Sequence, residues 1–203
     1  MKKDKKKYSS ILVFLGAGSK LLQAQLSNSD EIFTIPAYPL KYFPSLYKEW
    51  INQNKFLTSK KILKLIIKHH KSVLDTRYLK GFNGLNNLGK NKNGYIKIPE
   101  KKFAKNFLRY LRYRSLEPKN LYDAIHFAYQ KTQKNKGKNI VFHPHDIEFF
   151  NSFILDNYPK SKIIALTRSP IINFWRRGYA DEKVEQDRYD FTDCEYIKNY
   201  RYL

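Results

Sequence analysis

The chain has 203 residues and a formal net charge of +21, with 42% hydrophobic and 16% aromatic residues. This length fits a single domain over residues 1–203, and the apolar content excludes a wholly disordered chain. The positive charge favours polyanions, phosphate-bearing ligands or an anionic surface as partners. Lys outnumbers Arg and is accompanied by much Asn, Ile and Tyr, so a bias in composition explains the charge equally well.

Cysteine content and apolar runs point to a soluble, cytoplasmic protein. Cys194 is the only cysteine, so an internal disulfide framework is excluded. The N-terminus resembles a signal peptide in its basic start. Its apolar run at 11–15 is too short for the apolar core of a signal peptide, and it is soon interrupted by Gly16, Gly18 and Lys20. No apolar run approaches the roughly 20 residues that a transmembrane helix needs. We therefore expect no transmembrane segment.

In the first half of the chain, a basic tail (1–7) precedes an all-apolar strand within 9–18 that runs into a glycine turn. A helix over 19–28 follows, with Ser19 as its N-cap. A second strand is predicted at 31–37, and helices at 39–56 and 59–79. The Gly- and Asn-rich stretch 80–99 is predicted to be a mobile loop that serves as a lid or binds substrate.

The second half begins with two amphipathic helices and then returns to strands. The helix over 100–114 buries Phe103 and Phe107, and the helix over 118–131 buries Leu121 and Ala128. A strand at 139–143, a helix at 146–158, a buried strand at 162–167 and a helix from 170 follow. Residues 181–203 lack a strong periodicity and are interpreted as an incomplete C-terminal part.

This alternation of apolar strands and helices predicts an α/β protein, a three-layer sandwich around a central parallel sheet. Ligands of such sheets bind beyond the carboxyl ends of the strands. Three segments that are distant in the sequence should therefore meet at one edge: 16–20, 143–145 and 168–177.

The segment LTRSPIINFWRR has the features of an anion site. Arg168 ends the predicted strand, Ser169 caps the next helix, and Pro170 suits the first turn of that helix. Free N–H groups at a helix start attract phosphate, and Arg binds it bidentately. Arg176 lies two turns further on the same face. A salt bridge between Arg168 and a neighbouring carboxylate is the alternative.

Two other segments are candidates for chemistry at the same edge. FLGAGSK has the layout of a phosphate-cradling loop with Lys20 facing the transferred group, or is a simple tight turn. His143 and His145 point the same way if the backbone is extended. A general base is a more economical role than a metal pair, because neutral His can deprotonate a hydroxyl near pH 7. Packing at a turn is the structural alternative, and no metal is expected.

Three segments carry a resemblance to the sulfotransferases that use 3′-phosphoadenosine 5′-phosphosulfate (PAPS). They are ILVFLGAGSKLLQAQLSNSDEIFTIPA, LYDAIHFAYQKT and NIVFHPHDIEFFNSFILDNYPKSKIIALTRSP, in that order. The first resembles the opening strand, sulfate-side loop and helix of the family. The third is similar to the stretch that leads to an Arg-x-Pro after a strand, and it is the most distinctive.

The resemblance implies a P-loop-hydrolase-like sulfotransferase fold and transfer of a sulfuryl group from PAPS to a hydroxyl or amine. The acceptor would be a carbohydrate or a lipid-linked sugar. Arg168 would hold the 3′-phosphate, and Arg176 stands where the family usually has Ser. The loop is shorter than in the family and lacks its hydroxyl pair. The implied catalytic residues are Lys20, His143 and His145, and the cofactor-binding residues are Gly16, Gly18, Ser19, Lys20, Arg168 and Arg176.

Three other functions remain open. The shortened loop is compatible with a catalytically degenerate relative that binds a nucleotide. The basic stripe Lys102, Lys105, Arg109 and Arg112, with tyrosines nearby, would suit nucleic acid. A solvated helix face is the preferred explanation of that stripe, so nucleic acid is not expected as a partner. A basic helix at 59–79 lying on a membrane is the third alternative.

Overall fold

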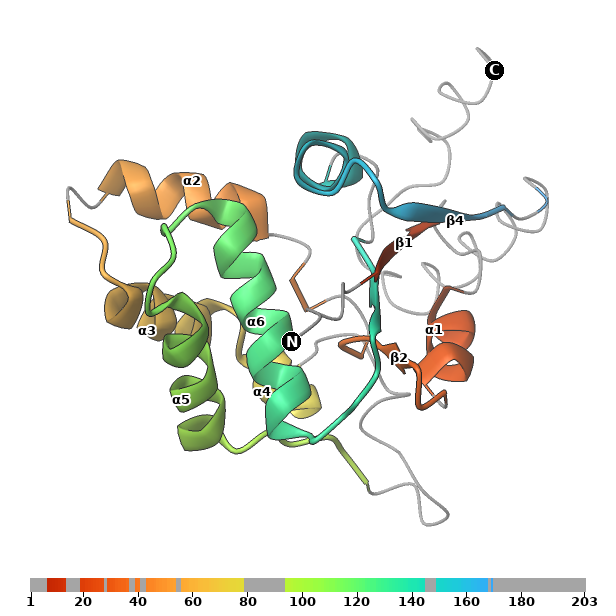
Figure 1. Ribbon diagram of the computed structural model, residues 1–203, viewed down its shortest axis with the longest axis horizontal. Coiled ribbons are helices and arrows are strands. Elements are labelled where there is room, and N and C mark those ends of the chain that lie inside the picture. Colours follow the sequence, from red (N-terminus) through yellow and green to blue (C-terminus); the bar gives the residue numbers. More distant parts are fainter. Residues whose placement is uncertain are drawn as a thin grey trace, which may run out of the picture.

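The computed structural model describes residues 7–13, 19–27, 29–36, 39–40, 43–53, 56–78, 94–144, 149–167 and 169. Its centre is a four-stranded sheet in the order β2-β3-β1-β4 (Figure 1). The strands are β1 (Lys7–Val13), β2 (Ile32–Phe33), β3 (Asn139–Phe142) and β4 (Lys162–Leu166). Every pairing is parallel. The predicted α/β class with a central parallel sheet is confirmed.

The strand register brings the carboxyl ends of the strands to one edge. Ser10 lies opposite Phe142, and Val13 lies opposite Leu166. Phe33, the last residue of β2, pairs with Ile140, two residues before the end of β3. In a parallel sheet the loops that follow all strands emerge at this edge. We call it the carboxyl edge.

Helices cover both faces of the sheet (Figure 1). Side chains alternate between the faces along a strand, and β3 shows this with two neighbouring residues. Val141 packs with Leu22 and Leu26 of α1 (Ser19–Ser27). Phe142 faces the other way, onto Tyr122 of α6 (Pro118–Thr132), with 5.2 Å between the ring centroids. The π-helix η3 (Phe150–Leu155) lies on this second face as well.

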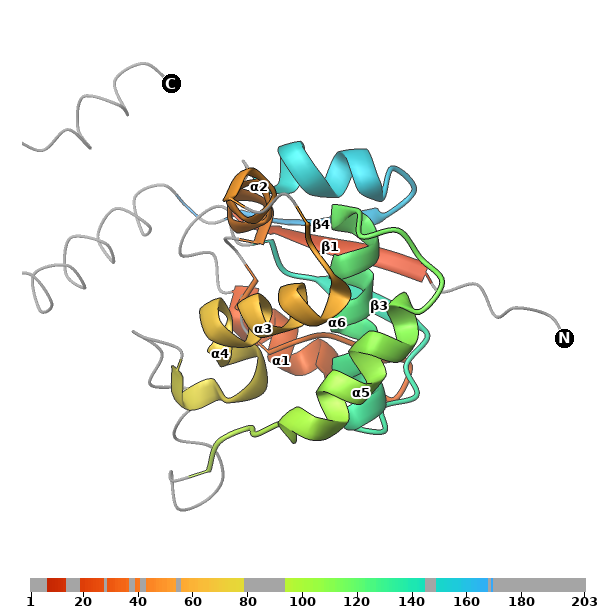
Figure 2. The ribbon, with the colours of Figure 1, turned by 90° about the vertical axis from the view of Figure 1, so that its left-hand side faces the viewer.

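A further layer of helices covers α6 on its outer side (Figure 2). It contains α3 (Ser59–His69), α4 (Lys71–Leu74), the 3-10 helix η1 (Thr76–Tyr78) and α5 (Glu100–Leu111), with α2 (Phe43–Gln53) beside them. The predicted inward positions of α5 and α6 are confirmed. The buried residues there include Phe103, Phe107, Leu121, Ala124, Ile125 and Ala128.

One core joins the sheet to these helices, and its centre is aromatic. Tyr122 contacts rings from three other elements, among them Phe43 of α2 at 5.5 Å and Phe153 of η3 at 5.1 Å between centroids. Tilted and edge-to-face contacts of this kind contribute roughly 0.5–1.5 kcal/mol each beyond the burial of apolar area. The aromatic content therefore serves mainly to fix the helical layers on the sheet.

Several predicted elements differ from those observed. The helix predicted over 59–79 is interrupted at His70, whose φ of −119° and ψ of 43° are not helical. The break lets the His70 ring turn inward onto the carbonyl of Pro39, 2.9 Å from Nδ1. The chain then continues as α4 and η1. The periodicity of apolar residues alone does not reveal such a break, because the apolar residues after it keep the same helical spacing.

The C-terminal strand is the second correction. The run KIIAL was predicted to be a buried strand, but β4 is an outer strand of the described sheet and Ile163 is 49% exposed. β2 is also shorter than predicted, with two residues. The helix at 100–114 ends at Leu111, and β1 begins at Lys7, inside the predicted basic tail. The helix predicted over 146–158 contains the π-helical segment η3.

Candidate site at the carboxyl edge

A crevice is expected at the carboxyl edge between β1 and β3. The chain leaves β1 toward α1 on one face of the sheet, and leaves β3 toward η3 on the opposite face (Figure 1). Neighbouring parallel strands whose connections depart to opposite faces form the topological switch point, where open α/β sheets bind ligands. The order β2-β3-β1-β4 places β1 and β3 side by side. The candidate site therefore lies where residues after Val13 and Phe142 begin.

Gln23 connects the elements around this crevice. Its Nε2 donates to Thr34 Oγ1 at 2.8 Å and to the carbonyl of Ile35 at 2.7 Å, both just after β2. Its Oε1 lies 3.2 Å from Nδ1 of His143, the first residue after β3. Because Gln23 is itself on α1, one buried amide ties α1 to the ends of two strands.

This network also assigns the tautomer of His143. The two donations from Nε2 orient the Gln23 amide, so Oε1 is the atom that faces the ring. An amide oxygen only accepts hydrogen bonds, and Nδ1 of His143 therefore carries the proton. The lone pair is then on Nε2, the nitrogen that a general base would use. His143 is buried, with 7% of its surface exposed.

Ser19 and His143 are the predicted site residues whose side chains the structure describes. Ser19 is the first residue of α1 and is buried. It precedes Gln23 by four residues, about one helical turn, so both lie on the same face of α1. The structure thus brings Ser19 near the network that holds His143. For Lys20 it describes the backbone within α1 and not the side chain.

The other predicted residues lie outside the described part of the chain. They are Gly16, Gly18, His145, Arg168 and Arg176. Their neighbours in the sequence are placed, because β1 ends at Val13 and β4 ends at Leu166, opposite one another. The strands that precede these two segments thus both end at the carboxyl edge. The predicted loop 80–99 and the C-terminal part 181–203 also fall wholly or largely outside the described residues.

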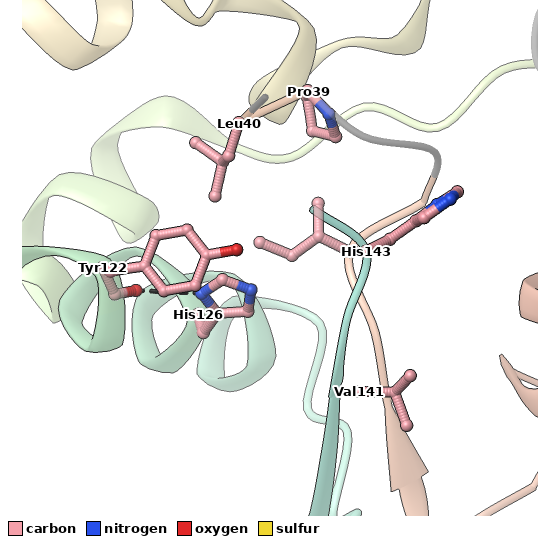
Figure 3. Close-up of a pocket in the computed structure, with 7 residues that line it drawn as sticks. Pro39, Leu40, Tyr122, His126, Val141 and His143 are labelled. Atoms are coloured by element: carbon pink, nitrogen blue, oxygen red, sulfur yellow. Dashed lines mark hydrogen bonds between the residues drawn. The ribbon is translucent and has the colours of Figure 1, made fainter. Parts of the chain in front are cut away.

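A small pocket lies beside the crevice, at the ends of β2 and β3 (Figure 3). It has about 10 Å³ of space for the centre of a water molecule, which is roughly enough for one water. Its lining is mostly apolar. The residues are Ile35, Pro39, Leu40, Tyr122, His126, Val141 and His143.

Tyr122 and His126 supply polar groups to this pocket from α6 (Figure 3). The Tyr122 hydroxyl points toward the centre of the pocket. Burial raises the pKa of Tyr122 well above its ordinary value, so this hydroxyl stays protonated and can donate. His126 donates from Nδ1 to the Tyr122 carbonyl at 2.9 Å, one turn back along the helix. His126 is itself buried.

The described residues offer few other functional groups at this edge. No three side chains among His, Cys, Asp and Glu come together there, or elsewhere in the described ranges, in a way that could hold a metal ion. Within the same ranges, no helix is both long and apolar enough to cross a membrane. The prediction of no metal site remains a prediction, because His145 and the acidic residues that follow it are not described.

Sequence reasoning missed Gln23 and Tyr122. The signal for Gln23 was weak: it stands between Leu22 and Leu26, on a helix whose exposed positions are also polar. Tyr122 was not singled out, although it flanks a predicted core position. A burial pattern can indicate that a polar residue faces inward, but it does not identify the partners of that residue, and one of them, His143, is 120 residues away from Gln23.

No known protein family, curated protein or solved structure matches the chain. What can be stated therefore comes from the fold. The chain is an α/β protein with an all-parallel central sheet, and its switch point carries a buried Gln-His pair.

Proposed function

We propose that this protein is a PAPS-dependent sulfotransferase that transfers a sulfuryl group to a hydroxyl or amine of a carbohydrate or lipid-linked acceptor. The observation that carries the proposal is the buried Gln23–His143 pair, which joins α1 to the end of β3 at the switch point between β1 and β3. Support comes from the sequence resemblance, whose first and third segments include the strands that flank this crevice. Parallel α/β sheets bind nucleotides at such points.

The residues at the edge have the chemistry that this reaction requires. N–H groups at the start of α1 and the ammonium of Lys20 would stabilise negative charge on the sulfuryl side. Arg168 and Arg176 would bind the 3′-phosphate. His143, with its proton fixed on Nδ1 by Gln23, would accept the proton of the acceptor at Nε2. His145 is the alternative base.

The groups named above account for every bond and proton that changes in the reaction. The acceptor oxygen or nitrogen forms a bond to sulfur while the bond from sulfur to the bridging phosphate oxygen breaks. The acceptor proton moves to the base, and adenosine 3′,5′-bisphosphate leaves with the bonding electrons. As in phosphoryl transfer, positioning and charge stabilisation would provide most of the acceleration. A general base would typically add about 10²- to 10⁴-fold.

Binding of adenosine 3′,5′-bisphosphate tests the nucleotide site. A ligand at about 100 times its Kd stabilises by about 2.7 kcal/mol, which corresponds to a rise in Tm of roughly 5–10 °C for a chain of this size. We expect the rise in the wild type and its loss in Arg168→Ala. Lys160→Ala is the matched control, because it removes one positive charge from the turn before β4, at the opposite end of that strand.

Two outcomes would decide against the proposal. An unchanged Tm of the wild type with saturating bisphosphate contradicts a PAPS site. Binding without transfer of radiolabelled sulfate from PAPS to mixed glycan and glycolipid acceptors favours the degenerate nucleotide-binding relative, for which the shortened loop is the supporting observation. Transfer that is lost in His143→Ala and kept in His126→Ala would support His143 as the base.

A further inference from the structure

Helix α3 presents a continuous basic face to solvent. Its apolar side chains point inward, with Ile62 and Ile66 almost fully buried. At 100° per residue, all four lysines of the helix fall on the opposite side, and all are exposed: Lys60, Lys61, Lys64 and Lys68. The helix contains no Asp or Glu. No carboxylate on α3 can therefore neutralise these charges.

Helix α5 repeats this arrangement. Phe103 and Phe107 face the core with no exposed surface, and the exposed basic residues lie on the opposite side of the helix. Glu100, in the first turn, is the only acidic residue of the helix. The basic residues, including the one that follows the last turn, are Lys101, Lys102, Lys105, Arg109 and Arg112.

The tertiary structure sets the two helices side by side. α3 contacts α5, and both lie on the outer side of α6, away from the sheet (Figures 1 and 2). The basic side chains of these two neighbouring helices are all exposed to solvent. We call the nine basic residues of the two preceding paragraphs the basic face. None of them forms an ion pair with a described residue. Within the described part of the chain, the one ion pair found joins Arg77 and Asp75.

Keeping these charges together opposes folding. Like charges four residues apart on a helix destabilise it by about 0.2–0.5 kcal/mol per pair. Lys60–Lys64 and Lys64–Lys68 are such pairs on α3, and α5 has two more that share Lys105. A bound polyanion would relieve this repulsion and release its own counterions.

The side chains between the charges indicate which polyanion fits. None of the large hydrophobic side chains exposed in the described residues lies on α3 or α5. Single-stranded nucleic acid binds with several aromatic stacking platforms, and membrane-surface helices insert rows of apolar side chains. The basic face has an exposed aromatic neighbour only at one end, where the Arg112 guanidinium lies 5.1 Å from the centroid of the Tyr113 ring, and none of the exposed large hydrophobic side chains in the described residues stands between its charges. A duplex needs only cations, because it carries about one phosphate charge per 1.7 Å along a stiff axis. A rigid pair of helices matches that rigid ligand.

We propose that the basic face binds double-stranded nucleic acid through its phosphates, without reading the base sequence. Seven of the nine residues are lysines, which contact phosphates as point charges. Direct readout would instead call for Arg, Asn or Gln reaching base edges. This inference is independent of the sulfotransferase proposal, because α6 separates the basic face from the sheet and its carboxyl edge (Figure 1).

Fluorescence anisotropy with a labelled duplex of about 30 base pairs tests the proposal. With six or more phosphate contacts, the logarithm of the association constant should fall linearly with the logarithm of the salt concentration, with a slope of about −5 or steeper. Two triple variants should each weaken duplex binding at least tenfold at about 100 mM salt. They are Lys60→Gln/Lys64→Gln/Lys68→Gln on α3 and Lys102→Gln/Lys105→Gln/Arg109→Gln on α5. Each lost contact should also reduce the magnitude of the slope by about 0.9.

The control variant removes the same amount of charge elsewhere. Lys131→Gln/Lys136→Gln/Lys160→Gln alters exposed lysines that lie off the two helices, and it should weaken duplex binding less than threefold. Equal loss in the control and in the helix variants would overturn the proposal, since net charge would then explain binding. Tighter binding to heparin, or to vesicles of phosphatidylserine, than to a duplex at equal charge would overturn it as well. Tm values no lower than that of the wild type, and unchanged bisphosphate binding, would show that folding and the nucleotide site are intact in the variants.

Discussion

His70 occupies an aromatic environment that favours its neutral form. Its ring lies 6.4 Å from Phe43 and 6.3 Å from Trp50 between centroids. Nδ1 donates to the carbonyl of Pro39, and Nε2 is buried with no hydrogen-bond partner among the residues that the structure describes. Burial lowers the pKa of His70 to about 4, with a small contribution from neighbouring His69, although the Pro39 carbonyl acts in the opposite direction. Protonation of His70 is thus coupled to folding.

This coupling predicts a loss of stability in mild acid. The pKa of His70 is near 6.5 in the unfolded chain and about 4 in the folded one, so the unfolded state binds the extra proton. The contribution of His70 to stability is fully present above pH 6.5 and falls as the pH drops toward 4. From pH 7.5 to pH 5 the free energy of unfolding should fall by roughly 2 kcal/mol from this residue. Urea denaturation at several pH values measures it.

The variant His70→Gln isolates the effect. Its amide can still donate to Pro39 but does not titrate, so the difference between wild type and variant should shrink as the pH falls. His69→Gln is the control, because the neighbouring His69 is exposed. A constant difference between wild type and His70→Gln from pH 7.5 to 5 would contradict the assignment of this pH dependence to His70.

At the scale of elements, α3 shows how a helix can be well formed and yet electrostatically strained. Thr58 caps it, with Oγ1 accepting from the Lys61 N–H at 3.2 Å. Its inner residues Ile62 and Ile66 are held in the core. The solvent side carries only lysines, and these repel one another. Packing therefore compensates for an unfavourable charge pattern.

Lys64→Glu should stabilise the protein for this reason. The substitution replaces two repulsive pairs, with Lys60 and Lys68, by two attractive ones. Each repulsive pair that is removed and each attractive pair that is formed contributes about 0.2–0.5 kcal/mol. The gain in the free energy of unfolding is therefore about 0.8–2 kcal/mol at low salt. It should largely vanish in 1 M salt, where the Debye length is about 3 Å. Thermal melts at both salt concentrations provide the measurement.

Lys48→Glu on α2 is the matched control. Lys48 is exposed in mid-helix and has no charged residue three or four positions away. Lys48→Glu reduces the net charge by the same amount as Lys64→Glu, and it should increase the free energy of unfolding clearly less. Equal stabilisation by both variants would show that the overall positive charge matters, and not the local row on α3.

At the scale of the whole molecule, Gln23 joins regions that are distant in the sequence. It links α1 to the segment after β2 and to the residue after β3. All these groups are buried, including Thr34 and His143. Losing one partner from such a network leaves the others buried without hydrogen bonds, at about 1–3 kcal/mol per group. The carboxyl edge depends on this amide for its shape.

Gln23→Met should therefore destabilise the protein by about 2–4 kcal/mol. Methionine has a similar length and flexibility, so the loss reflects hydrogen bonds more than packing. Gln25→Met, an exposed position on the same helix, should stay within about 0.5 kcal/mol of the wild type. Chemical denaturation compares the three proteins, and similar stabilities of the two variants would refute the role given to Gln23.

Much of the fold could be predicted from local patterns. The helix over 118–131 and its inward residues, such as Leu121 and Ala128, follow from a period of 3.6. The strand 139–143 follows from its apolar run. The break at His70 and the exposure of Ile163 could not be predicted, because both depend on what the rest of the chain places beside them. In the candidate site, His143 was predicted and its partner Gln23 was not.

The α/β class of this protein follows from its local patterns, because alternating apolar strands and amphipathic helices pack most readily as a parallel sheet covered by helices. Other features appear only in the folded molecule: the order β2-β3-β1-β4, the outer position of β4, the bond between Gln23 and His143, and the contact of α3 with α5. The difference lies in the sequence separation of the contacts involved. Periodicity records which side of an element is buried, whereas these features depend on contacts between segments that meet only after the chain has folded.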